Sequence, residues 1–352
     1  MRRKIWLVLA VMALASPAHA EDLLDWIETQ ASGLQHSSTV STEMDNAQLL
    51  TLEPGENEMY PKVSSAGKKM LVVSGKRRRV AITLRLIENG DPLNVAIEHD
   101  ERALNSFAWH GADHMSFLSL RAGGLGVWEK AVDGQGIIRR LHRLQGEITD
   151  PVILNDGSVI AVRLHPASNQ KQRRGKKDGF LNWETTGGQA HIVHISKEGV
   201  EVDLTVGVNP AVSPDGQQLV FSMQAGRSRH LFTMNIDGSD LVQLTEERSI
   251  DAQPAWSPDG KWIVFTSNRS KADMRQLKKS NWDIWAIDRD GRNLVQLTHN
   301  AARDGAPNVS ADGRVYFHSD RKVSRDEQEL RQVKGNISGF HIWSVDLPAN
   351  LR

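Results

Sequence analysis

The chain repeats one short pattern, and this repetition limits the folds that it can adopt. Residues 254–260 read Pro-Ala-Trp-Ser-Pro-Asp-Gly, and residues 210–216 read Pro-Ala-Val-Ser-Pro-Asp-Gly. After each of these segments come apolar runs, an Asp-Gly pair and the sequence Leu-Val-Gln-Leu-Thr. Self-similarity of this kind is typical of supersecondary units that bury their apolar faces against one another.

Weaker copies bring the number of repeats to six, with anchors at Pro61, Phe107, Pro151, Pro210, Pro254 and Pro307. Each copy reads as four short strands rich in β-branched and aromatic residues, separated by turns in which glycine supplies the positive φ. Packed around one axis, such units bury each face against a neighbour and protect their edges. The sequence therefore predicts an all-β, six-bladed β-propeller of four-stranded antiparallel blades over residues 47–352.

The last blade is predicted to take one strand from the start of the domain. The sixth copy ends near Leu347 before a fourth strand can form. Residues 48–51, Gln-Leu-Leu-Thr, precede Pro61 much as residues 243–245 precede Pro254. We therefore expect residues 47–52 to complete the last blade and close the ring. The alternative is that this segment is a plain linker strand.

The first residues have the features of a secretory signal peptide. Arg2, Arg3 and Lys4 precede an apolar run at residues 5–15, and residues 18–20 read Ala-His-Ala, a small-x-small cleavage pattern. The run is shorter than the roughly 20 residues that a membrane-spanning helix needs. We expect residues 1–20 to be removed on export and the mature protein not to span a membrane.

Residues 21–46 are expected to form a short N-terminal segment ahead of the propeller. Leu23, Leu24 and Ile27 have helix-like spacing. A helix here would either cover one propeller face as a lid or dock a partner, and both interpretations stay open.

Composition excludes several classes of function. Lys+Arg and Asp+Glu each number 43, so the basic excess of a DNA-binding protein is absent. The chain has no cysteine, which excludes disulfides, thiolate zinc sites and iron–sulfur clusters. An exported protein of this size without cysteine fits a bacterial periplasm. We expect a periplasmic protein with no nucleic-acid partner and no metal or other cofactor.

The repeated Pro-x-Trp-Ser-Pro-Asp-Gly, Asp-Ile-Trp, Asp-Gly and Leu-Thr elements resemble the WD-like repeat of the TolB β-propeller family over residues 47–347. The resemblance implies six blades and a periplasmic scaffold that binds the peptidoglycan-associated lipoprotein on a propeller face. The same repeat occurs in propeller domains of prolyl oligopeptidase-like peptidases and in oligogalacturonate lyase. The chain departs from TolB itself, because residues 21–46 leave no room for the α/β domain that precedes the TolB propeller.

Strand direction assigns the loops to two faces of the ring. The fourth-to-first and second-to-third connections lie on what we call the first face, and the Pro-Asp-Gly and Asp-Gly turns lie on the second face. The second-to-third connections are basic. The candidate binding residues among them are Arg77, Arg78, Lys171, Arg173, Arg174, Lys176, Lys177, Lys278 and Lys279, and further cations there are Lys76, Arg79, Arg121, Arg227, Arg229, Arg269, Lys271, Arg275, Arg321, Lys322, Arg325, Arg331 and Lys334. This fringe would steer an anionic partner, or it would simply be solvated.

Three acidic residues stand on the same face, each three residues before a proline anchor: Glu58, Asp251 and Asp304. They belong to blades one, five and six, which are neighbours in a closed ring, and so they are expected to form an acidic arc near the channel mouth. The carboxylates would receive a lysine or a cation, or they would cap the turns that enter the inner strands.

Histidines were weighed as metal ligands or catalytic groups. The residues that begin the third strands are His191, His230, Asp283 and His341. Third strands of separate blades lie too far apart for ligand distances of about 2 Å, so these residues are predicted to be structural. His165, His299 and His318, near the channel mouth, keep a catalytic role open.

No Gly-x-Ser-x-Gly or His-Glu-x-x-His motif occurs, so catalysis is disfavoured but not excluded. The sequence therefore favours a non-enzymatic, monomeric, periplasmic scaffold of the cell envelope. Its first face would dock an envelope protein or lipoprotein, or an anionic envelope polymer. The alternative is a periplasmic propeller that binds or degrades a glycan by lyase chemistry.

Overall fold

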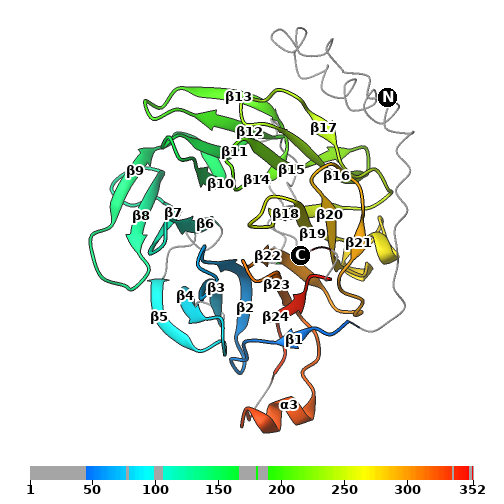
Figure 1. Ribbon diagram of the computed structural model, residues 1–352. Coiled ribbons are helices and arrows are strands. Elements are labelled where there is room, and N and C mark those ends of the chain that lie inside the picture. Colours follow the sequence, from blue (N-terminus) through cyan, green and yellow to red (C-terminus); the bar gives the residue numbers. More distant parts are fainter. Residues whose placement is uncertain are drawn as a thin grey trace.

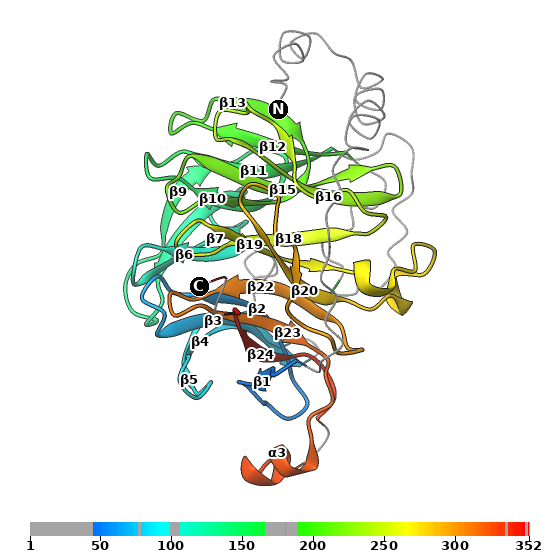
Figure 2. The same ribbon diagram turned by 45° about the vertical axis from the view of Figure 1, so that its right-hand side comes forward.

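A computed structural model describes residues 45–76, 79–98, 106–165, 180, 189–334, 337–348 and 351. Six four-stranded antiparallel sheets are arranged around a central axis, as Figure 1 shows from one face and Figure 2 shows obliquely. The predicted six-bladed β-propeller is confirmed. The predicted signal peptide and nearly all of residues 21–46 lie outside the described residues. No helix within the described part of the chain is long and apolar enough to cross a membrane.

The blades follow one another along the chain. Blade one contains β2 (Asn57–Val63), β3 (Lys69–Lys76), β4 (Arg79–Leu86) and β5 (Pro92–Glu98). Blade two contains β6 (Phe107–His110), β7 (His114–Ser119), β8 (Gly126–Ala131) and β9 (Arg139–Arg143). Blade three contains β10 (Glu147–Ile153), β11 (Val159–His165), β12 (Gln189–Ile195) and β13 (Glu201–Val206). Blade four contains β14 (Val208–Val212), β15 (Gln218–Ala225), β16 (Ser228–Asn235) and β17 (Val242–Gln243). Blade five contains β18 (Asp251–Trp256), β19 (Trp262–Ser267), β20 (Asp283–Asp288) and β21 (Val295–Gln296). Blade six contains β22 (Asp304–Val309), β23 (Arg314–Ser319), β24 (His341–Asp346) and β1 (Gln48–Leu49). Short helices η3 (Arg269–Lys271), η4 (Leu277–Lys279) and α3 (Arg325–Leu330) lie in the connections of blades five and six.

The N-terminal strand closes the ring, as predicted. β1 pairs antiparallel with β24, with Gln48 opposite Ser344 and Leu49 opposite Trp343. The ordered sheet of blade six is therefore β1-β24-β23-β22, and the two ends of the propeller meet in one blade.

The Leu-Thr pair explains why this segment fits the last blade. In blade five, Leu297 N donates to Ile284 O at 2.8 Å and Thr298 Oγ1 accepts from Ile284 N at 2.8 Å. In blade six the same bonds are made by the N-terminal segment: Leu50 N donates to Ile342 O at 2.8 Å, and Thr51 Oγ1 accepts from Ile342 N at 3.1 Å. The threonine hydroxyl takes the place of a ladder carbonyl where the short outer strand ends, so a buried N–H keeps a partner.

Apolar side chains from adjacent blades form the core. Between blades five and six, for example, Val264 and Ile284 pack in one cluster with Val315 and Phe317, all of them inaccessible to solvent. Burying a side chain of this size stabilises the fold by roughly 1.5–3 kcal/mol. Side chains alternate along each strand, so every blade has two such apolar faces, and each face is buried by a neighbouring blade.

Five inner strands carry a bulge that the repeat pattern did not predict. The residue before each anchor proline has positive φ: Tyr60, Asp150, Asn209, Gln253 and Ala306. The ladder to the second strand shifts register at each of these points. Blade two has Phe107 at the anchor in place of proline, and its β6–β7 ladder is regular. Proline lacks the N–H that a ladder needs, so the bulge falls where the sequence removes a donor.

Candidate functional site

The three predicted acidic residues begin inner strands, and their side chains are fully buried. Each forms an ion pair with one arginine: Glu58 with Arg85 at 3.0 Å, Asp251 with Arg269 at 2.6 Å, and Asp304 with Arg321 at 2.6 Å. The carboxylates therefore neutralise cations inside the protein. A charge buried at this depth needs such a partner.

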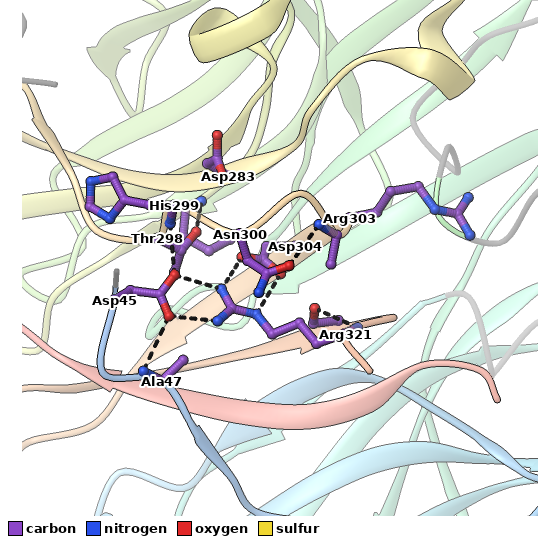
Figure 3. A network of polar contacts seen from close by, with 12 residues as sticks. Asp45, Ala47, Asp283, Thr298, His299, Asn300, Arg303, Asp304 and Arg321 are labelled. Atoms are coloured by element: carbon purple, nitrogen blue, oxygen red, sulfur yellow. Dashed lines mark hydrogen bonds and ion pairs between the residues drawn. The ribbon is translucent and has the colours of Figure 1, made fainter. Parts of the chain in front are cut away.

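Arg321 joins both ends of the propeller (Figure 3). Its Nη1 lies 2.6 Å from Asp45 Oδ1, and its Nη2 lies 2.6 Å from Asp304 Oδ2. Asp45 also accepts from the backbone N–H groups of His299 and Ala47. Burial alone would raise the pKa of Asp45, but the hydrogen bond and charge of Arg321 lower it below the usual range. The segment that leads into β1 is thus fixed to blade six by an ionised carboxylate.

The same arginine arrangement recurs in three blades, each time from a Phe-x-Ser-x-Arg sequence at residues 117–121, 265–269 and 317–321. The guanidinium lies over the phenylalanine and over a tryptophan of the third strand. The ring centroids lie at 5.1 and 5.8 Å for Arg121, 5.4 and 5.3 Å for Arg269, and 5.3 and 5.6 Å for Arg321. The serine hydroxyl accepts from the arginine side chain in blades two and five. These arginines are structural parts of their blades.

The residues that begin the third strands face the acidic residue of the following blade. His341 Nδ1 of blade six lies 3.0 Å from Glu58 Oε2 of blade one, and His230 of blade four interacts electrostatically with Asp251 of blade five. Between blades five and six the histidine is replaced by Asp283, whose neighbour is Asp304. Each of these side chains has its partner across a blade interface.

Asp283 is held in its protonated form at neutral pH. Burial and, to a smaller extent, the charge of Asp304 raise the pKa of Asp283 to about 8, although hydrogen bonds from Ser270 and Asn281 act against the shift. Two carboxylates in one buried site cannot both ionise cheaply. Burial also raises the pKa of Asp304, but the charge and hydrogen bonds of Arg321 oppose that shift. Asp283 has no such contact with Arg321, so it is the carboxyl that keeps its proton more readily.

An aromatic cluster lies on the first face and joins three blades. Phe180, which follows β11 in the second-to-third connection of blade three, stacks on Phe340 of blade six at 5.7 Å. It also meets the edge of Trp282 of blade five at 5.5 Å. Phe180 is fully buried, and Arg303 lies over its ring at 5.4 Å. The connection of blade three is therefore anchored on blades five and six.

The three candidate catalytic histidines lie in different surroundings. His318 is fully buried in the aromatic cluster and accepts from Tyr60 N at 3.2 Å, and burial lowers its pKa to about 3. His299 is partly exposed beside Asp45, and His165 is exposed with its ring edge against His191. Within the described ranges, no three or more His, Asp or Glu side chains are arranged to hold a metal ion.

Some residues of the predicted basic fringe lie outside the described part of the chain. Those within it are either exposed cations or cations that are buried. Arg77, Arg78, Lys171, Arg173, Arg174, Lys176 and Lys177 lie outside the described residues. Lys278 is in η4, and Lys279, at its end, is exposed. Other exposed cations of the fringe are Arg227, Lys271, Arg275, Lys322 and Arg325, whereas Arg229, Arg269 and Arg321 have buried side chains or lie in buried ion pairs. Counting charges in loops could not separate the two classes, but the Phe-x-Ser-x-Arg pattern could have done so for two of the buried residues.

Comparison with known proteins gives one family and several structures. Residues 172–274 match the family described as TolB beta propeller domain. A structure described as TolB from Agrobacterium tumefaciens is 16% identical with a TM-score of 0.51, over 84% of this chain and 91% of that chain. Oligogalacturonate lyase from Vibrio parahaemolyticus is 12% identical with a TM-score of 0.51, over 89% and 97%. Regucalcin, a calcium-binding protein from Agrobacterium tumefaciens, is 13% identical with a TM-score of 0.53, over 87% and 95%.

Comparison with curated protein sequences gives no match. At these identities the similar structures establish the fold alone, and they carry different activities.

Proposed function

We propose that this six-bladed propeller, which is similar to the TolB propeller domain, is a non-enzymatic scaffold of the bacterial periplasm that docks an envelope protein on its first face. By resemblance to TolB, the partner class is a lipoprotein of the peptidoglycan-associated type. The binding residues of this proposal are the basic ones of the second-to-third connections.

The observation that carries the proposal is the set of exposed cations in the second-to-third connections. Arg227, Lys271, Arg275, Lys279 and Lys322 are all exposed on the first face. None of the five forms an ion pair with another residue of the described ranges. They contribute little to folding, and they are placed to attract an anionic surface and to raise its association rate.

The segment with Lys171, Arg173, Arg174, Lys176 and Lys177 is proposed to add to this surface. It follows His165 at the end of β11 and precedes Phe180, which is seated on blades five and six. Both flanking points belong to the first face, and we therefore propose that the cations between them bind the same partner.

The chemistry of the histidines favours binding over a lyase mechanism. A general base works best with a pKa near the operating pH. Burial holds the pKa of His318 at about 3, and its Nδ1 accepts a backbone N–H, so this side chain lacks a free basic nitrogen at that position. A lyase would need its base elsewhere.

The test is charge reversal with a matched control. In one variant Lys171, Arg173, Arg174, Lys176 and Lys177 become glutamate; in the control, five exposed cations of the second-face turns do so, namely Lys68, Lys69, Lys197, Lys261 and Arg292. Each tagged mature protein is used to capture partners from its own periplasmic and envelope fractions at low and at moderate salt, with identification by mass spectrometry.

We expect the first-face variant to lose about tenfold or more of one envelope protein, with the control unchanged. Wild-type capture should weaken with salt, because screening acts on exposed charges. Equal capture by both variants would contradict the proposal. Retention of envelope polysaccharide without protein, together with an unsaturated uronate product absorbing in the ultraviolet, would favour the lyase alternative.

Export is tested separately. The protein recovered from the periplasm should begin at Glu21, which N-terminal sequencing measures directly. A protein that keeps Met1 and fractionates with the cytoplasm would contradict the proposed location without bearing on the docking surface.

A further inference from the structure

β5, the outer strand of blade one, is the longest outer strand among the described residues. It has seven residues, against six in β13, five in β9 and two each in β1, β17 and β21. Two large apolar side chains of β5, Leu93 and Val95, are 46% and 42% exposed. β5 pairs only with β4 among the described strands, so its other edge faces outward. A long apolar edge is usually protected in native proteins.

Other outer strands show how such protection is achieved. Arg331 covers the carbonyls of the short closing segment, donating to Leu49 O at 2.7 Å and to Leu50 O at 2.9 Å. On β13, Glu201 pairs with Arg163, and Asp203 lies 2.7 Å from His191. On β5, by contrast, Lys130 of blade two donates to one carbonyl, Ala96 O, at 2.7 Å.

A hollow of about 380 Å³ lies along this edge, between blades one and two. Its lining comprises Val95, Ala96, Ile97 and Glu98 of β5, together with Arg121, Lys130 and Ile138 of blade two. Successive side chains of a strand point to opposite faces. Because four consecutive residues of β5 line the hollow, it runs beside this strand.

The hollow carries more positive than negative charge. Its lining has two cations, Arg121 and Lys130, against one acidic residue, Glu98, and Arg139 of the neighbouring β9 is already paired with Glu129. A chain that follows the edge would bury apolar side chains against Val95 and Ile138 and would place acidic ones toward Arg121 and Lys130.

We propose that the β5 edge binds an extended peptide segment of a partner protein, with alternating apolar and acidic side chains, as a fifth strand of blade one. Main-chain hydrogen bonds would supply affinity, and the hollow with its cations would supply specificity. This surface lies on the outer wall of the ring and is separate from the first-face surface. The two binding proposals are therefore independent of each other.

The probe is a labelled peptide of alternating valine and glutamate, N-methylated on alternate residues so that one edge cannot pair. Methylation on the outer edge keeps the peptide from self-association, and methylation on the inner edge blocks pairing with β5. A lysine-for-glutamate peptide tests charge. Binding is measured by fluorescence anisotropy with the full mature protein, and hydrogen exchange maps the amides that become protected.

We expect binding of the outer-methylated valine–glutamate peptide and protection of amides in residues 92–98. Val95→Glu should weaken binding about tenfold or more, because it adds a like charge and removes an apolar contact. The matched control Val202→Glu, at a residue 52% exposed on β13, should leave it unchanged. Lys130→Gln provides a second variant, which removes the positive charge and the hydrogen bond to Ala96 O and should also weaken binding of the acidic peptide.

Equal binding of both methylated forms, or of the lysine peptide, would overturn the proposal. So would the absence of protection at residues 92–98, or equal effects of Val95→Glu and Val202→Glu. Binding of an oligogalacturonate that protects no β5 amide, in place of the peptide, would also overturn it.

Discussion

His341 and Glu58 lie 3.0 Å apart, Nδ1 to Oε2, across the junction between the last blade and the first, and neither side chain is exposed to solvent. On its other oxygen Glu58 meets Arg85 Nη2 at 3.0 Å. The junction that closes the ring therefore contains a buried charge network as well as apolar packing. Similar carboxylates at Asp251 and Asp304 mark two other junctions.

Glu58→Gln should destabilise the protein strongly. It leaves the buried Arg85 guanidinium with only the more exposed Glu53 carboxylate, 3.5 Å away, as a counter-charge, and breaking a buried pair costs up to roughly 3–5 kcal/mol. Urea unfolding at neutral pH measures the change. Asp290→Asn, which breaks the exposed pair with Arg292, is the control and should cost less than about 1 kcal/mol. Similar losses from the two substitutions would show that burial of the Glu58 network matters little.

Asp45→Ala should loosen the closing strand without unfolding the ring. The substitution removes the contact of Arg321 with the segment before β1, while the ion pair of Arg321 with Asp304 remains. Hydrogen exchange at Gln48 and Leu50 amides should become faster, whereas exchange in β11 should not change. Unchanged exchange in the closing segment would mean that the ladder to β24 holds it alone.

Asp283 should make folding stability fall as pH rises. Its folded pKa of about 8 is above that of an unfolded aspartate, so the folded state binds more protons than the unfolded state between about pH 4 and about pH 8. Ionisation of the buried group therefore destabilises the folded state across this range. Asp283→Asn should remove that component, which the difference between variant and wild-type unfolding free energies isolates at each pH. A difference that does not vary with pH would contradict the assigned protonation.

Phe180→Ala should expose His318. Burial lowers the pKa of His318 to about 3, and Phe180 is part of the surface that buries it, with ring centroids 5.6 Å apart. Truncation admits water and raises the pKa of His318 toward its ordinary value, which an NMR titration of the imidazole follows. Val242→Ala, at an exposed outer-strand residue, is the control. A pKa that stays near 3 would show that other side chains alone bury the ring.

The fold could be read from the sequence because its repeats are local and regular. The Asp-Gly turns and Leu-Thr pairs specify strand boundaries, and the displaced copy at Leu50 and Thr51 is enough to predict the closing strand. The bulges at Tyr60 and Gln253 were not predicted. They follow from the anchor prolines, because proline has no N–H to donate to the neighbouring strand.

The candidate site was less predictable, because the sequence does not show whether a charged side chain in a loop points into the solvent or into the protein. Arg269 and Arg321 were grouped with solvated cations, but they turn inward onto Phe265 and Phe317 and pair with buried aspartates. Such contacts join residues that are close in space only after the blades form. The docking role of the basic connections stays a prediction.

The closing strand also sets an order on biosynthesis. Gln48 pairs with Ser344, so one of the first segments of the propeller to be made can find its place only after one of the last has been made. Contacts between residues so distant in sequence form slowly and late. A nascent chain thus cannot complete its ring until nearly its whole length has emerged.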